Sequence, residues 1–229
     1  MITDFLQSDF FRRFKKQVRL KIKPHDKISF LHSLPPYAQI LDVGCGNNSP
    51  YITKTIQPSC IYTGIDIGDY NQSKVNLADY YLVTDADGFA AKIAEFKACF
   101  DVVISSHNLE HCNHREQTLN AMLGAVKPGG LFYLSFPCEQ SVTFPKRLGT
   151  LNYYDDATHK DLPPDFEGIL KSIQAQGFEV QRAIKNYKPV VFWLLGLLLE
   201  TKSRRNNQVY VSTWAFYGFE SIITAKKIT

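Results

Sequence analysis

The segment that most constrains the fold is a short apolar run that leads directly into two glycines. Residues 40–43 have the composition of a buried parallel strand, and Gly44-Cys45-Gly46 follows them without a break. Glycines at such a point let the backbone turn sharply and approach a ligand, while the next helix offers free N–H groups. The pattern predicts a ligand at the carboxyl ends of the strands of an α/β sheet, although several cofactors share it.

Strand-like and helix-like segments alternate after this loop. Further strands are predicted over residues 60–66, 80–84, 100–105 and 131–136, and helices over 89–96 and 116–126. The C-terminal part adds a helix over 165–176, a strand over 178–187, an apolar run at 189–199 and a last strand over 214–226. This alternation predicts a mainly parallel sheet with helices on both faces.

The chain of 229 residues is long enough for one domain with a large core. We predict this domain over residues 38–229, with an apolar insertion at about 189–205, preceded by a basic helical region at 1–37. In that region eight Lys or Arg residues lie between Arg12 and Lys27, and apolar residues share helical spacing at Phe10, Phe11, Phe14 and Val18. The net charge of +4 is too small to predict a nucleic-acid partner by itself.

The cysteines indicate a reducing compartment. The chain has five, without a CxxC pair, so neither a zinc site nor a disulfide framework is expected. The first residues lack the features of a signal peptide. The apolar run is about half of the roughly 20 residues that span a bilayer. A cytoplasmic protein is therefore predicted.

Asp66 ends the second predicted strand about twenty residues after the loop, where a carboxylate can accept hydrogen bonds from both hydroxyls of a ribose. NAD and S-adenosylmethionine both carry such a ribose. The dinucleotide fingerprint would also need glycine at position 49, where the chain has Ser49 before Pro50. An NAD-dependent oxidoreductase of the Rossmann type is thus an alternative with an incomplete motif.

Six segments together resemble the successive motifs of class I S-adenosylmethionine-dependent methyltransferases with a type 11-like domain. They are Ile40-Leu41-Asp42-Val43-Gly44-Cys45-Gly46, Gly64-Ile65-Asp66, Thr84-Asp85-Ala86, residues 100–105, Asn108-Leu109-Glu110-His111 and residues 123–131. The resemblance covers about residues 38–137. It implies a Rossmann-like, three-layer α/β/α fold with a seven-stranded, mostly parallel sheet and an antiparallel last strand.

The same resemblance implies S-adenosyl-L-methionine as the cofactor and suggests which residues contact it. Asp42, Gly44, Cys45 and Gly46 would hold the methionine portion, Asp66 the ribose with Ile67 beside it, and Asp85 with Ala86 the adenine edge, while Ser105 and Ser106 would line the methyl side.

Methyl transfer to a hydroxyl needs alignment of the reactants and a base, for which histidine suits neutral pH. His107 follows the fourth strand and His159 lies in the polar loop after the fifth, so both are catalytic candidates. His111 is expected to order its loop. Asp155 and Asp156 could orient His159 or bind a divalent metal with it, but paired aspartates are also ordinary turn formers, and we predict no metal.

The apolar run at 189–199 has three interpretations: buried core, a dimer contact, or a surface that dips into a membrane while Lys202, Arg204 and Arg205 meet lipid headgroups. The last would suit a lipid-linked acceptor. We predict methylation of an oxygen in a small-molecule, sugar or lipid-linked acceptor. RNA methylation guided by the basic helix is an alternative, although nucleic acid is the less favoured partner. No oligomeric state is indicated.

Overall fold

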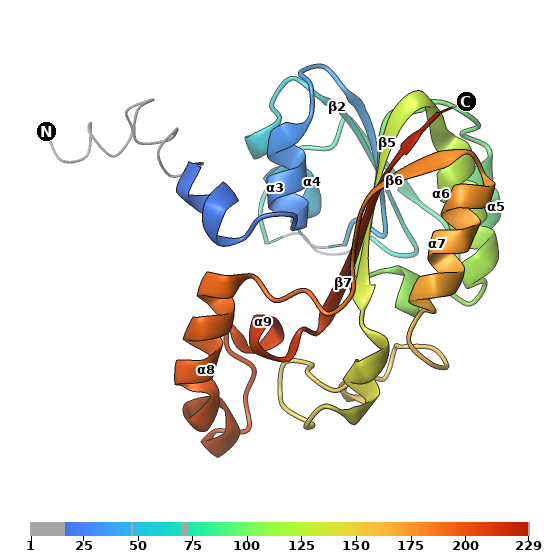
Figure 1. Cartoon of the computed structure of the whole chain (residues 1–229). Helices are drawn as coiled ribbons and strands as arrows, with labels where there is room; N and C mark the ends of the chain where they lie inside the picture. Colours follow the sequence, from blue (N-terminus) through green and yellow to red (C-terminus); the bar gives the residue numbers. More distant parts are fainter. Residues whose placement is uncertain (1–16, 47, 70–72, 229) are drawn as a thin grey trace, which may run out of the picture.

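The computed structural model describes residues 17–46, 48–69 and 73–228. Its centre is a seven-stranded sheet in the order β3-β2-β1-β4-β5-β7-β6 (Figure 1). The strands are β1 (Gln39–Val43), β2 (Ile61–Asp66), β3 (Tyr80–Val83), β4 (Phe100–Ser106), β5 (Val126–Pro137), β6 (Phe178–Ile184) and β7 (Glu220–Lys227). β1 to β5 pair in parallel, and β7 runs antiparallel to both β5 and β6. The predicted Rossmann-like sheet with its antiparallel last strand is confirmed.

Helices cover both faces of this sheet (Figure 1). On one face lie α3 (Lys27–Ser33) and α4 (Ser49–Ile56), and on the other α5 (Phe89–Ala94), α6 (Arg115–Ala125) and α7 (Phe166–Ala175). Successive side chains of a strand point to opposite faces. In β1, Ile40 therefore packs with Leu31 of α3, whereas Leu41 belongs to the apolar cluster on the face of α5 and α6. Both faces of the central strands are thus buried, as a parallel sheet requires.

β5 begins earlier than the sequence predicts. α6 ends at Ala125, and Val126 already pairs with Phe100 of β4. Pro128-Gly129-Gly130 was expected between helix and strand, but it lies inside β5, where the pairing with β4 shifts in register. Gly129 has a φ of +77°, a conformation that glycine adopts without strain.

A short helix, α9 (Thr213–Tyr217), replaces the predicted start of the last strand at Trp214. Gly218 ends it with a φ of +73°, and β7 begins only at Glu220. α9 packs closely on α8 (Val190–Arg205), since a Cβ at Gly196 would lie 2.6 Å from the Cβ of Phe216. Tertiary packing on α8 therefore overrides the strand preference of these aromatic residues.

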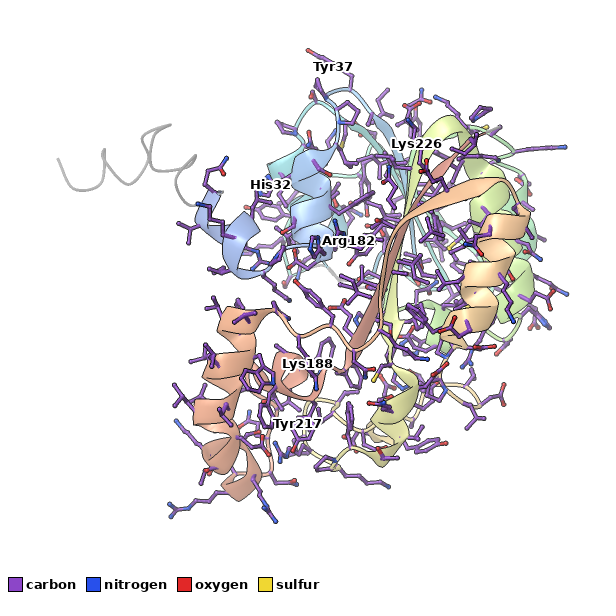
Figure 2. All side chains as sticks on the ribbon, viewed as in Figure 1. His32, Tyr37, Arg182, Lys188, Tyr217 and Lys226 are labelled. Carbon is purple, nitrogen blue, oxygen red and sulfur yellow. The ribbon has the colours of Figure 1, made fainter. Side chains whose placement is uncertain are left out.

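Beyond the carboxyl edge of the sheet, α8 and α9 form a lobe with the loop after β5, which carries η2 (Glu139–Thr143) and η3 (Tyr153–Asp155) (Figure 1). Figure 2 places Tyr217 in this lobe and Tyr37 at the opposite end of the molecule. Arg147 joins the loop to α8, because its guanidinium donates to Glu200 Oε2 at 2.9 Å, to Glu200 Oε1 at 2.6 Å and to Ser203 Oγ at 2.7 Å.

The apolar side chains of α8 are mostly exposed, with Val190 at 70% and Leu198 at 78%. Burial in the core of this chain, one of the three interpretations of the apolar run, is therefore wrong. No helix among the described residues is long and apolar enough to cross a bilayer. Of the predicted basic helix, residues 12–16 lie outside the described part, and residues 17–22 are helical.

Candidate functional site

The carboxyl ends of β1, β2 and β4 bring the glycine loop, Asp66 and Asn108 together. Gly44 has a φ of +69°, and a Cβ there would lie 2.1 Å from Cγ of Asn108. The Gly46 N–H donates to Asp66 Oδ2 at 2.7 Å, and the Ile67 N–H donates to Oδ1 at 2.8 Å. Burial raises the pKa of the Asp66 carboxyl, although the two N–H groups oppose this. A Cβ at Gly46 would meet nothing within 4 Å, so a ligand has room against the loop backbone.

A small pocket lies beside Asn108. Ile67 and Ala86, both predicted to contact the cofactor, line it together with Phe89 and His111. Apolar walls with a few polar groups suit a nucleobase. The Asp85 carboxylate accepts from the Gly88 N–H at 2.7 Å, and this hydrogen bond lowers the pKa of Asp85. Asp85 therefore orders the start of α5 as well as standing near the pocket.

Asp42 is fully buried and holds the strand to the two helices on one face of the sheet. Its Oδ2 accepts from Lys27 Nζ at 2.8 Å, from Ser49 Oγ at 2.6 Å and from Tyr62 OH at 2.8 Å. Within the part of the chain that the structure describes, Oδ1 has no hydrogen-bond partner. The Asp42 carboxylate thus fixes the glycine loop by anchoring the residues around it.

Three other predicted cofactor residues have their side chains engaged inside the fold. The Cys45 thiol is buried, which raises its pKa. Ser105 Oγ donates to the Val43 carbonyl at 3.1 Å, and Ser106 Oγ lies 2.9 Å from Ser135 Oγ. A ligand at this edge would therefore meet the backbone of Cys45 and Ser105 before their side chains.

His107 lies between two carboxylates. Its Nε2 is 3.2 Å from Glu220 Oε1 of β7, and its Nδ1 is 3.2 Å from Glu110 Oε1. Burial alone would lower the pKa of His107, but hydrogen bonding and the charges of the two glutamates raise it to about 10. The ring is therefore protonated at neutral pH. Such a group can orient carboxylates or stabilise negative charge, but it has no free lone pair to accept a proton.

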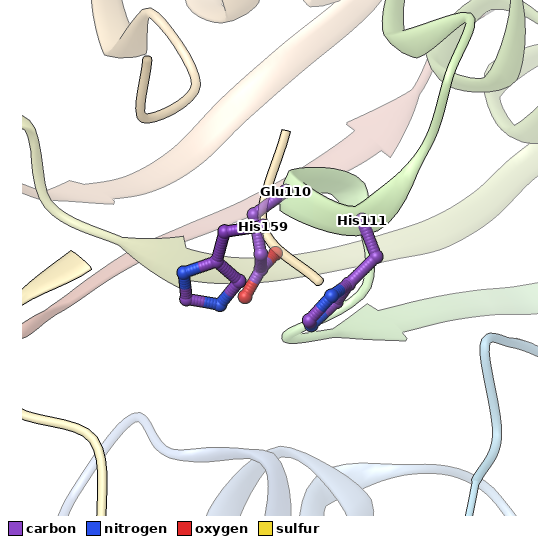
Figure 3. A group of neighbouring side chains, drawn as sticks. All are labelled: Glu110, His111 and His159. Atoms are coloured by element: carbon purple, nitrogen blue, oxygen red, sulfur yellow. The ribbon is translucent and has the colours of Figure 1, made fainter. Parts of the chain in front are cut away.

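Glu110, His111 and His159 converge at one point, which we call the histidine corner (Figure 3). Glu110 and His111 lie in η1 (Leu109–His111), and His159 comes from the loop after β5. One ligand atom from each of the three lies within 4.8 Å of the others. The two imidazole rings are 4.8 Å apart between centroids. The sequence analysis considered His159 and His111 separately and did not connect either with Glu110.

Polar contacts hold the loop of His159 against η1. The Lys160 N–H donates to the Glu110 carbonyl at 2.9 Å, and Arg115 Nη2 donates to the same carbonyl at 3.0 Å and to Tyr153 OH at 2.9 Å. The His159 ring stacks on Tyr153 with centroids 4.4 Å apart. Burial lowers the pKa of His159. These contacts explain how segments almost 50 residues apart meet at one corner.

The two consecutive aspartates of the loop have structural partners. Asp155 Oδ2 accepts from the N–H groups of Arg147 at 3.0 Å, Leu151 at 3.0 Å and Asn152 at 2.9 Å. Asp156 Oδ1 accepts from the Thr158 N–H at 2.9 Å. Asp156 Oδ2 lies 4.0 Å from His159 Nε2, too far for a hydrogen bond. Turn formation, the simpler of the two sequence interpretations, thus accounts for both carboxylates.

A second pocket of about 320 Å³ lies between the sheet edge and the lobe. Its walls are largely aromatic and aliphatic, with Trp214 and Phe192 from the lobe, while Lys23 and Glu220 supply charge. The pocket adjoins His107, which touches both Trp214, at 5.1 Å between ring centroids, and Glu220. Sequence reasoning missed Trp214 and Glu220, because their role depends on β7 lying beside β5, with its first residue at the carboxyl edge.

Comparisons with known proteins place this arrangement in a family. Residues 13–183 match the family model described as a methyltransferase domain. The chain is 37% identical over 106 residues to the ubiquinone biosynthesis O-methyltransferase of Saccharophagus degradans, covering 42% of this chain and 42% of that protein. It is 31% identical over 109 residues to the tRNA (carboxymethyluridine(34)-5-O)-methyltransferase of Arabidopsis thaliana, covering 47% of this chain and 26% of that protein. The match spans less than half the length of either relative.

Solved structures support the fold. A chain of the complex between the Haloferax volcanii Trm112 methyltransferase activator and the putative methyltransferase aligns with a TM-score of 0.63. The two chains are 15% identical, and 94% of each is covered. At this identity the likeness concerns the fold alone.

Proposed function

Because the chain belongs to the methyltransferase family that uses S-adenosylmethionine, we propose that it methylates a hydroxyl oxygen of a small-molecule, sugar or lipid-linked acceptor. The family match confirms the predicted family and cofactor. The observation that carries the acceptor proposal is the mainly apolar pocket beside the lobe, whose lining residues Trp214 and Glu220 both contact His107 at the carboxyl edge of the sheet. The similarity to the O-methyltransferase of Saccharophagus degradans supports oxygen as the acceptor atom.

The residues present fit the cofactor, because there is open space at Gly46 and a small pocket with apolar walls beside Asn108. In this proposal the loop backbone from Gly44 to Gly46 holds the methionine portion, and the Asp66 carboxylate accepts from the ribose hydroxyls. Ile67 and Ala86 enclose the adenine. When bound, the cofactor supplies an electrophilic methyl group on a sulfonium.

The acceptor hydroxyl must lose its proton as its oxygen attacks the methyl carbon. His107, with its raised pKa, is suited to orienting Glu110 and Glu220, not to accepting that proton. His159 Nδ1 lies 2.6 Å from the Tyr153 carbonyl and must donate to it, so Nε2 keeps a free lone pair. We therefore place deprotonation at the histidine corner, with His107 as a positioning residue.

Peripheral membrane contact is the finer part of the proposal. α8 presents exposed apolar side chains, contributes Phe192 of its first turn to the acceptor pocket, and carries Lys202, Arg204 and Arg205 in its last turn. An apolar face combined with basic residues binds anionic lipid surfaces. Such a position would bring the pocket close to a lipid-linked acceptor.

The proposal is tested by incubating the protein and labelled S-adenosylmethionine with fractionated cell extract. Label in small molecules, glycans or lipids, on a base-stable and acid-stable ether, supports it. Label in RNA would overturn the acceptor class and favour the alternative, to which the tRNA-modifying relative lends support. Calorimetry with S-adenosylhomocysteine and NAD tests the identity of the cofactor separately. S-adenosylhomocysteine should bind and NAD should not.

A further inference from the structure

We infer that the histidine corner is a binding site for one divalent transition-metal ion, held by the Glu110 carboxylate and the Nε2 atoms of His111 and His159. One possible ligand atom of each residue lies within 4.8 Å of those of the other two, and Figure 3 shows the carboxylate between the two rings. Two imidazoles and one carboxylate form a ligand set that proteins use for zinc and for non-haem iron, with positions left open for other ligands.

The hydrogen bonds around the rings direct both free lone pairs to this point. His159 Nδ1 donates to the Tyr153 carbonyl at 2.6 Å. Thr158 Oγ1 donates its proton to Asp156 at 2.6 Å, so it accepts from His111 Nδ1 at 2.9 Å. Each ring therefore carries its proton on Nδ1 and an acceptor at Nε2. Histidines that bind metals are commonly fixed in this way by a carbonyl or hydroxyl behind the ring.

The burial of Glu110 is an independent observation in favour of a cation site at the histidine corner. Its side chain is fully buried, and neither carboxylate oxygen has a hydrogen-bond partner among the described residues. The His107 ring, 3.2 Å from one Glu110 oxygen, also serves Glu220, so a cation between the Glu110 carboxylate and the two imidazole acceptors would lower the cost of burying this carboxylate.

The distances set a limit on the geometry. In a tetrahedral site with bonds of about 2.1 Å, the ligand atoms are roughly 3.4 Å apart. The distances between the ligand atoms would therefore shorten by about 1 Å when the ion binds, which side-chain rotation allows. Imidazole nitrogens favour zinc, iron, cobalt or nickel over magnesium and calcium, which prefer oxygen ligands.

His111 also lines the pocket proposed for the cofactor, so the ion would lie next to the reacting groups. A metal ion lowers the pKa of a hydroxyl bound to it. This use of the ion rests on the proposed function, and it would make His159 act through the metal and not as a lone base. Metal binding itself does not depend on any acceptor.

The test is titration of untagged, chelator-treated full chain with Co²⁺, followed by calorimetry and visible absorption. We expect one Co²⁺ per chain with absorption typical of nitrogen and oxygen ligands. Glu110→Gln, His111→Gln and His159→Gln should each weaken binding at least tenfold, since even changes behind a ligand cost 10- to 100-fold. His25→Asn, at a histidine outside the corner with a φ of +76° that asparagine tolerates, should bind normally.

Thr158→Val provides a second variant that leaves all three ligands in place and changes an exposed residue. It removes the acceptor behind His111 and should weaken Co²⁺ binding about tenfold without loss of the folded far-ultraviolet spectrum. Unchanged binding in all four corner variants, absence of binding to the wild type, or sulfur-to-cobalt charge-transfer absorption would overturn the site. Stoichiometric binding of Co²⁺ without methylation of any extract fraction would support the metal site and contradict the proposed function.

Discussion

At the scale of single residues, Gly44 is subject to two constraints at once. Its φ of +69° disfavours a side chain, and a Cβ would overlap Asn108. Gly44→Ala should lower the free energy of unfolding by about 1–2 kcal/mol, because alanine is strained at this φ. It should also push Asn108 out of its position in the small pocket. We expect the affinity for S-adenosylhomocysteine to fall at least tenfold, about 1.4 kcal/mol, in calorimetry.

The matched control is Gly124→Ala in α6, where a Cβ meets nothing within 4 Å and φ is not positive. This change should raise the free energy of unfolding by roughly 0.5–1 kcal/mol and leave cofactor affinity unchanged. Wild-type affinity in Gly44→Ala would contradict the close approach of the loop to Asn108.

Residues within one local motif were predictable, and residues paired across the sheet were not. Gly44, Gly46 and Asp66 follow from a strand end and a fixed spacing, which the sequence displays directly. The pKa of His107 is raised by Glu110, three positions later, and by Glu220, which lies 113 positions later and reaches His107 through the pairing of β7 with β5; it is the second of these that no local pattern displays. His107 was therefore predicted as a base.

At the scale of elements, the loop after β5 is held by one carboxylate. Asp155 accepts three backbone N–H groups, and with Asn152 it forms a capping box at η3. Asp155→Ala would leave buried donors unpaired and should lower the free energy of unfolding by about 2 kcal/mol. Urea denaturation measures this, with Asp161→Asn as the control, because Asp161 is an exposed residue of the same loop and asparagine tolerates its φ of +44°. Equal stability of the two variants would show that the cap is dispensable.

The exposed face of α8 carries the membrane prediction. Leu194→Asn combined with Leu198→Asn changes side chains that are 49% and 78% exposed, so folding should be little affected. Removing this apolar area should weaken binding to anionic vesicles at least tenfold in a flotation assay. Tyr37→Asn, which changes an exposed residue at the other end of the molecule, should bind vesicles like the wild type (Figure 2). Wild-type binding by the double variant would exclude α8 as the lipid contact.

At the scale of the whole molecule, the sheet and the lobe differ in how well their sequence predicts them. The sheet half alternates strands and helices, which predicts a mainly parallel sheet, and the resemblance to class I methyltransferases implies the antiparallel last strand. The lobe has no such repeat. The position of α9 depends on its contact with Gly196, and the aromatic pocket is complete only when α8, α9 and the edge of β7 meet.

The variant Arg147→Met tests whether the stability of the lobe can be changed without affecting the cofactor site at the sheet. The Arg147 side chain is 3% exposed, and Arg147→Met would remove the charged partner of Glu200 and leave that carboxylate with the hydrogen bond from Tyr217 OH at 2.7 Å, so the free energy of unfolding should fall by about 3 kcal/mol. Hydrogen bonds from Arg147 lower the pKa of Glu200 in the folded state. The stabilisation is therefore complete above the unfolded-state pKa of about 4.3 and is lost as the pH falls through the lower folded value.

Urea denaturation should accordingly show the full difference in the free energy of unfolding between wild type and Arg147→Met at pH 7. The difference should be smaller near pH 3.5, since Glu200 becomes protonated in both proteins. Binding of S-adenosylhomocysteine at pH 7 should change less than twofold, because the Arg147 guanidinium bonds to Glu200 and Ser203 of α8, whereas Asp66 accepts from Gly46 at the sheet edge. Methylation of the acceptor should decline, since Glu200 and Arg147 hold α8 over the pocket. A pH-independent difference would show that the ion pair is not the source of the stability, and loss of cofactor binding would show that the lobe and the sheet act as one unit.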